Sequence, residues 1–128
     1  MDKIRHNHPE IAPPAGQFSR SIRAGDFLFI AGTTARGSAA EAGSMCDQIL
    51  ATINTIRRII EAEGGSLQDI VRTTTYVTSI EEWRACAAER EAFTQEAYQG
   101  NFPTDALIEI KGLASPTLKI EIEATAVL

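Results

Sequence analysis

The residues most suited to chemistry are four carboxylates near the C-terminus, spaced at alternate positions of two short runs. The runs span residues 104–111 and 118–127, and apolar and polar residues alternate in both. This alternation predicts two half-buried strands, and the Gly/Ser/Pro-containing stretch between them predicts a loop. Because successive side chains point to opposite faces of a strand, we expect the carboxylates to share one face and the aliphatic residues to meet the core. The carboxylates are Asp105, Glu109, Glu121 and Glu123.

Other catalytic groups are scarce. The only histidines, His6 and His8, lie in the N-terminal segment, which leaves no Ser/His/Asp or Cys/His nucleophile arrangement. No Cys/His cluster supplies further ligands beside the two histidines, so we predict no metal site. Cys46 and Cys86 fall in helical patterns and are interpreted as core thiols rather than a disulfide or a reactive pair.

The C-terminal region contains the motifs Pro103-Thr104-Asp105-Ala106, Gly112-Leu113 and Ile120-Glu121-Ile122. In order and spacing they resemble the signature of the RidA/YjgF family of small trimeric imine and enamine deaminases. The resemblance implies a RidA/chorismate-mutase-like fold from residue 18 onward, with sites in the clefts between subunits. It also implies that Glu121 positions or activates water. The stretch 23–34 further resembles the 2-aminomuconate deaminase branch of the family.

The resemblance also identifies candidate ligand-binding residues, several of which depart from the family pattern. Asp105 stands where the deaminases carry an arginine that grips the substrate carboxylate, and Phe18 replaces a common tyrosine. The family's Ser-Gly-Gln element here reads Ala31-Gly32-Thr33, where a glycine and a hydroxyl can still hydrogen-bond a ligand. The complete set of expected site residues is Glu121 and Asp105 as catalytic groups, with Phe18, Ala31, Gly32, Thr33, Arg36 and Leu107 binding the ligand.

The reversed charge at Asp105 leaves three interpretations open. At close range it would repel a substrate carboxylate by about 1–4 kcal/mol. The protein could be a hydrolase whose substrate is neutral or cationic, or one in which Arg20 or Arg36 supplies the grip. Asp105 and Glu121 could then divide acid and base roles. Alternatively it binds a small molecule or a protein without catalysis, or the two carboxylates only fix subunit register.

The remaining pattern supplies the elements that would position these groups. The predicted order is β-β-α-β-α-β-β: an α/β (α+β) fold with one mixed sheet and two helices on one face. After a proline-rich arm over residues 1–16, we expect strands at 18–24, 27–33 and 70–78, and helices at 44–63 and 79–98, with the two C-terminal runs as the last strands. The helices leave one sheet face uncovered, with Leu107 and Val127 expected on it, and self-association would cover it. The family resemblance implies that the assembly is a homotrimer.

Composition narrows the class of protein. A chain of 128 residues with 44% hydrophobic and 23% charged residues predicts one globular domain, spanning residues 1–128. The net charge of −5 argues against nucleic-acid binding, and no apolar run is long enough to span a membrane. We therefore expect a cytoplasmic protein, and the family resemblance implies that its ligand is a small molecule. No Gly-rich phosphate loop precedes the first helix, and no cofactor is expected.

Overall fold

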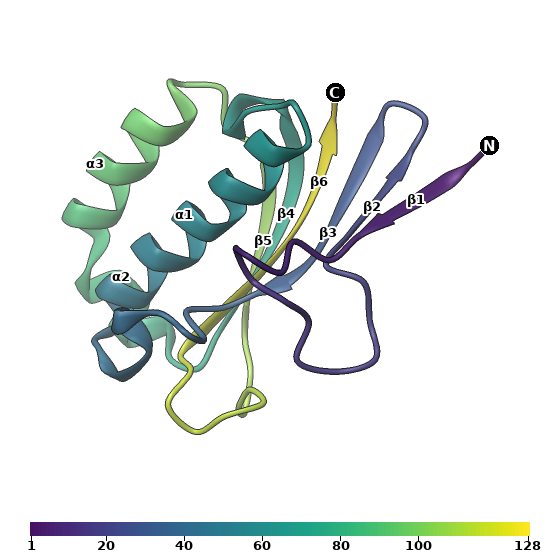
Figure 1. The fold of residues 1–128 in the computed structure, drawn as a ribbon. Helices are drawn as coiled ribbons and strands as arrows, with labels where there is room; N and C mark the ends of the chain where they lie inside the picture. The colour runs from purple at the N-terminus through teal and green to yellow at the C-terminus, as the bar shows by residue number, and fades with distance from the viewer.

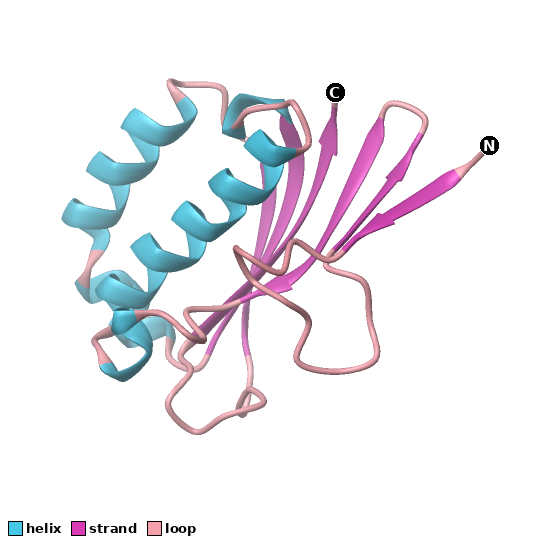
Figure 2. Cartoon of the chain, viewed as in Figure 1, coloured by secondary structure: helices cyan, strands magenta, loops and turns pink.

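A computed structural model describes all residues, 1–128, as one layer of three helices packed on a six-stranded sheet (Figures 1 and 2). The strands are β1 (Lys3–His6), β2 (Ser21–Ala24), β3 (Phe27–Thr33), β4 (Ile70–Val77), β5 (Thr104–Glu109) and β6 (Ile120–Val127). The helices are α1 (Met45–Ala62), α2 (Ile80–Ala85) and α3 (Ala87–Tyr98), with short 3₁₀ turns at Ala39–Ala42 and Leu67–Asp69.

The sheet is mixed and runs in the order β1-β2-β3-β6-β4-β5. Only β4 and β5 pair in parallel, while every other neighbouring pair is antiparallel. The C-terminal strand β6 lies at the centre between β3 and β4, so those two run in the same direction and α1 connects them as a crossover. The predicted fold class and element order are thus confirmed, except that the second predicted helix is divided into two and the arm contains a strand.

Helix α1 carries most of the core. Ser44 caps its first turn, accepting from the Asp47 N–H, while the Asp47 carboxylate accepts from the Ser44 N–H in return. Isoleucines at three- and four-residue intervals point into the sheet, and Ile49, Ile59 and Ile60 are fully buried. Burying each such side chain contributes about 1.5–3 kcal/mol, which fixes α1 firmly over β3 and β6.

The second predicted helix is broken at Cys86 into α2 and α3. The Trp83 carbonyl, which would accept the next helical N–H, instead accepts from the Cys86 thiol and the Arg90 guanidinium. Ser79 caps α2, accepting from the Glu82 N–H at 3.1 Å. The Glu82 carboxylate does not accept from the Ser79 N–H in return, because it pairs with Lys119.

The N-terminal arm departs from its prediction by adding a strand. Residues 3–6 pair antiparallel with β2 as edge strand β1, so the arm extends the sheet before it loops back across the end of β3 (Figure 1). The following strand begins only at Ser21, three residues later than predicted. The model contains no helix that is both long and apolar enough to cross a membrane.

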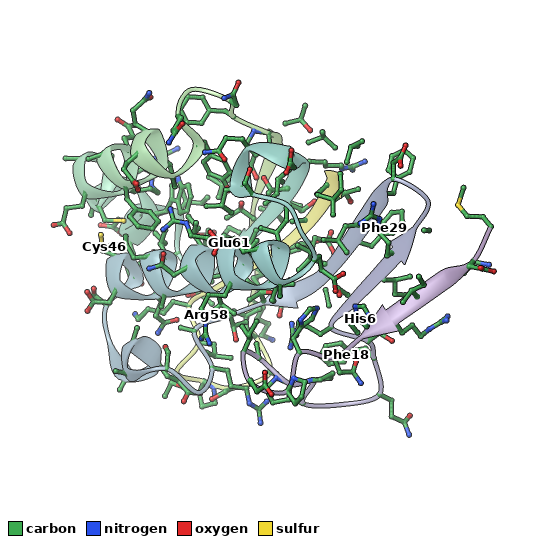
Figure 3. The ribbon with its side chains drawn as sticks, turned by 45° about the horizontal axis from the view of Figure 1, so that its top comes forward. His6, Phe18, Phe29, Cys46, Arg58 and Glu61 are labelled. Carbon is green, nitrogen blue, oxygen red and sulfur yellow. The ribbon has the colours of Figure 1, made fainter.

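The face of the sheet away from the helices carries exposed aromatic and aliphatic side chains. Phe27 and Phe29 of β3 stack there with ring centroids 6.3 Å apart, and each is about half exposed. Figure 3 labels Phe29 on β3, clear of the helices. Val127 of β6 pairs with Phe27 and continues the same surface, as predicted for this position.

The register of β5 corrects the prediction that the four carboxylates share a face. Asp105 pairs with Thr73, whose side chain is buried on the helix side of β4, and the Glu109 carboxylate accepts from the Ile80 N–H at the start of α2. Glu121 and Glu123, in contrast, alternate with the buried residues of β6 and face away from the helices. The carboxylates therefore form two pairs on opposite faces of the sheet.

Candidate functional site

A β-bulge at the end of β3 creates the space in which Glu121 lies. Ile30 pairs with Ala124 and Thr33 with Ile122, so Ala31 and Gly32 together face one residue of β6. At Gly32 the missing side chain is essential. A Cβ added there would lie 2.6 Å from the Glu121 Oε2 atom, so only glycine lets the carboxylate fold over the strand.

The Glu121 side chain is partly buried, and no donor of the chain forms a hydrogen bond with its carboxylate. Burial raises its pKa above the ordinary value, the neighbouring Glu123 carboxylate raises it further, and Arg20 lowers it. A carboxylate with a raised pKa is a stronger base once ionised, and it is better matched to proton transfer near neutral pH. Its free oxygens face a cavity, where they can accept from a water or a ligand.

Arg20 forms the polar floor of this cavity. Its Nε donates to the Ala12 carbonyl at 2.7 Å, and its Nη1 donates to the Gly32 carbonyl at 3.0 Å. The guanidinium carbon also lies 5.3 Å from the centroid of the Phe18 ring. Burial lowers the pKa of Arg20 and Glu121 raises it, but a guanidinium remains charged in proteins. Arg20 thus ties the arm to the bulge and adds positive potential beside Glu121.

The cavity has a volume of about 370 Å³ and is bounded by three separate parts of the chain. The arm and its continuation form one wall, the β3 bulge with the loop after it a second, and the start of β6 with its preceding loop a third. The lining residues are Ile11, Ala12, Pro13, Ala15, Phe18, Arg20, Gly32, Thr33, Thr34, Arg36, Gly37, Ala114, Leu118 and Glu121. Three charged groups, two positive and one negative, therefore face the same space.

Arg36 is the second cation of the cavity and the more available one. It is exposed on the loop after β3, and its side chain forms no hydrogen bond or ion pair within the chain. Its backbone N–H donates to the Thr34 hydroxyl, which orders the turn that carries it. The arrangement leaves a guanidinium free to bind an anionic group, while Glu121 is available to a reacting atom or water.

Asp105 does not share this cavity within one chain. It lines a different hollow on the helix side, together with Tyr98, Trp83 and Arg90. Its Oδ1 atom accepts from both the Thr73 and the Thr75 hydroxyl, each at 2.8 Å. A division of acid and base roles between Asp105 and Glu121 is therefore not available to groups of the same chain.

The other expected site residues also divide into those that line the Glu121 cavity and those that lie elsewhere. Phe18, Gly32, Thr33 and Arg36 are brought together with Glu121. Ala31 does not line the cavity, although its backbone N–H donates to the Arg20 carbonyl. Leu107 pairs with Thr75 of β4, so it lies on the helix side with Asp105 and not on the uncovered face where it was expected.

Sequence reasoning gave too little weight to Arg20 and to the arm residues Ala12 and Pro13. The available signal was the position of Arg20 itself, inside the first predicted strand and just after the end of the predicted arm.

The known proteins that this chain resembles match it over most of its length. Residues 9–128 match the sequence family described as Endoribonuclease L-PSP. A RutC family protein of Pyrococcus horikoshii is 33% identical over 121 residues, covering 91% of this chain and 92% of the relative. A 2-iminobutanoate/2-iminopropanoate deaminase of Salmonella typhimurium is 31% identical over 123 residues, covering 92% and 93%. The crystal structure of the YjgF gene product of E. coli superposes with a TM-score of 0.84 at 27% identity, covering 97% and 98%.

Proposed function

The chain belongs to the Endoribonuclease L-PSP family, also called RidA/YjgF, and from this membership we propose that it hydrolyses small imines or enamines beside Glu121. The observation that carries the proposal is the Glu121 carboxylate itself. It is unpartnered, its pKa is raised, and it faces a cavity that also contains two arginines. The net charge of −5 favours a small-molecule substrate over RNA, despite the family's description.

The proposed reaction needs only a held substrate, water and a base. Glu121 accepts a proton from water as the water oxygen attacks the imine carbon, and the C=N π electrons move to nitrogen. The nitrogen takes the proton held by Glu121, which gives a neutral carbinolamine. Its C–N bond then breaks while Glu121 carries the hydroxyl proton to the leaving nitrogen, and the O–H electrons form the new C=O bond. The net change consumes one water and releases a carbonyl compound and ammonia.

We propose that Arg36 binds the substrate. Because its guanidinium is positively charged, this role favours an anionic imine as the substrate class. Arg20 already donates to two carbonyls, whereas Arg36 has every guanidinium donor free. A bidentate contact with a carboxylate would hold a 2-imino acid with its C=N carbon toward Glu121. The relative named a 2-iminobutanoate/2-iminopropanoate deaminase is consistent with this substrate class.

Asp105 and Leu107 enter the proposal as contributions from a neighbouring subunit. The family resemblance places position 105 and Glu121 in one site between subunits, yet one chain holds them on opposite faces of its sheet. The shared site and the separation within one chain are compatible if β5 of one subunit borders the Glu121 cavity of the next subunit in a homotrimer. The threonine hydroxyls that bind Asp105 would reduce its repulsion of an anionic substrate.

The test is hydrolysis of a 2-imino acid generated in solution by an amino acid oxidase, followed by ammonia release. We expect the wild-type protein to accelerate hydrolysis, Glu121→Gln to lose the acceleration, and Arg36→Gln to raise KM with a smaller change in kcat. Arg84→Gln, an exposed arginine on α2, is the matched control and should behave as wild type. An unchanged KM in Arg36→Gln would remove Arg36 from the site.

Ligand binding without catalysis is the second candidate, and the departure at Asp105 favours it. The threonine hydroxyls hold this carboxylate where the family places a substrate-binding arginine. In that case imine analogues would raise the melting temperature through Arg36, and no ammonia would be released by the wild type or any variant.

A further inference from the structure

A second cluster of potential ligands lies away from the Glu121 cavity, where the arm crosses the end of α1. The Glu63 carboxylate Oε1 lies 2.7 Å from His6 Nδ1 and 2.9 Å from His8 Nε2. All three groups present ligand atoms within 4.8 Å of one another. This cluster was not predicted, because Glu63 lies 57 residues from His6 along the chain. Figure 3 labels His6 on the arm, at the edge of the sheet.

Glu63 is a buried carboxylate without a permanent cation. Its side chain is only 7% exposed and that of His8 only 9%, yet no lysine or arginine lies within ion-pair distance of Glu63. A buried charge that is not neutralised is strongly unfavourable. Glu63 is also the C-cap of α1, where the helix dipole favours a positive charge rather than a negative one. The local electrostatics thus call for a cation at the centre of this cluster.

We propose that His6, His8 and Glu63 bind one divalent transition-metal ion of the zinc class. Two imidazoles and one carboxylate are a ligand set used for such ions, at bond lengths of about 2.0–2.1 Å. Tetrahedral bonds of that length separate the ligand atoms by roughly 3.3 Å, so the two Glu63 contacts need to open by only about half an ångström.

Ser21 supports the same geometry from the outer side. Its hydroxyl lies 3.0 Å from His8 Nε2 and 3.3 Å from Glu63 Oε1, and the residue is almost completely buried. It can orient the carboxylate, as groups around metal sites commonly do. The three protein ligands leave one position of a tetrahedral ion for water.

The ion would anchor the arm that walls the Glu121 cavity. His6 and His8 stand shortly before Ala12, whose carbonyl binds Arg20, and before Phe18. A metal bond at this point attaches the arm to α1, which is fixed in the core. The metal site is nevertheless independent of catalysis, because its ligands do not line the cavity.

The thiols are the other group in the chain that could bind zinc, and they must be controlled for. Burial and hydrogen bonds to Glu89 and Cys86 raise the pKa of Cys46 to about 12, which keeps this thiol protonated at neutral pH. A protonated thiol is a poor ligand. The variant Cys46→Ser/Cys86→Ser therefore serves as a background in which only the histidine cluster can bind.

The experiment is titration of chelator-treated protein with Zn²⁺ by isothermal calorimetry. We expect one ion per chain with a micromolar or lower Kd in both the wild type and the thiol-free background. His6→Ala/His8→Ala should weaken binding at least 100-fold and Glu63→Gln at least tenfold. Zinc at a hundred times its Kd should raise the Tm by about 5 °C or more. Full binding by the double histidine variant, or no binding by the wild type, would overturn the proposal.

A measurement on the wild type alone covers variants that fail to fold. The chain has only two histidines, so an ¹⁵N spectrum of the imidazoles contains two ring systems. Zn²⁺ should shift the nitrogens of both rings at one equivalent. A shift in the exposed His6 alone, or in neither ring, would contradict a shared site.

Discussion

Glu121 and Gly32 depend on one another more closely than any other pair in the cavity. The carboxylate occupies the volume that a side chain at position 32 would need, and the bulge holds the two together. The Glu121 carboxylate can occupy its position because residue 32 has no side chain. Gly32 is therefore a positioning residue and not a catalytic one.

Gly32→Ala should displace Glu121 and reduce hydrolysis by tenfold or more, because small misplacements of a reacting group are costly. The fold should survive, since φ at position 32 lies outside the left-handed region. Gly112→Ala is the control, because its added Cβ would meet no atom within 4 Å. Steady-state rates with circular dichroism on both variants would show the difference. Equal activity in the two would mean that Glu121 is not held by Gly32.

At the residue scale, part of the expected group of residues lies together in the structure. Glu121, Gly32, Thr33 and Arg36 line one cavity, because neighbouring strands and their loops bring them together. Asp105 was wrongly predicted to share a sheet face with Glu121. The alternation over residues 104–111 directed the aliphatic side chains to the core, whereas Asp105 binds the hydroxyls of Thr73 and Thr75 on the helix side.

At the scale of the elements, the edge strand β5 is fixed by polar contacts rather than by a buried face. All six of its residues are exposed, whereas β6 alternates regularly between buried and accessible positions. Asp105 binds two threonines of β4, and Glu109 binds the first turn of α2. These contacts with distant parts of the chain explain why the sequence predicted the strand but not the sheet face on which each of its side chains lies.

Asp105→Ala should lower the free energy of unfolding by about 1 kcal/mol, because the hydroxyls of Thr73 and Thr75 lose their shared acceptor. Asp105→Asn keeps an oxygen at the same place and should cost less than half as much. Urea unfolding of both variants measures the difference. If both variants lost the same stability, the negative charge and not the hydrogen bonds would be fixing β5.

The other elements follow directly from local signals. The isoleucine spacing predicted α1 to within a residue at each end, and the β-branched run predicted β4. The break at Cys86 and the strand in the arm were missed. Both depend on tertiary contacts, the first on Arg90 reaching the Trp83 carbonyl and the second on pairing with β2.

At the scale of the whole molecule, one face of the sheet has no helix to cover it. The stacked rings of Phe27 and Phe29 and the side chain of Val127 lie there, surrounded by charged residues. Exposed aromatic surface of this kind, bordered by charge, is typical of an interface. It is the surface through which we propose that three subunits associate.

Light scattering should give a mass three times the 13.9 kDa of the chain at micromolar concentration. Phe29→Glu should shift the protein toward monomer, since it adds a charge to the surface that would be buried. Ala88→Glu adds the same charge to the exposed side of α3 and should leave the mass unchanged. A wild-type monomer would argue against the interface and against a site shared between subunits.

The central claim is that Glu121 is the base of an imine hydrolase, and the pH dependence of kcat/KM for 2-imino acid hydrolysis tests it most directly. Because burial raises the pKa of Glu121, the rate should fall as pH decreases through a value above the ordinary 4.5 of a glutamate. Glu121→Gln should lose this acid limb and at least about 100-fold in rate. A wild-type rate no faster than buffer, or an acid limb that persists in Glu121→Gln, would contradict the claim.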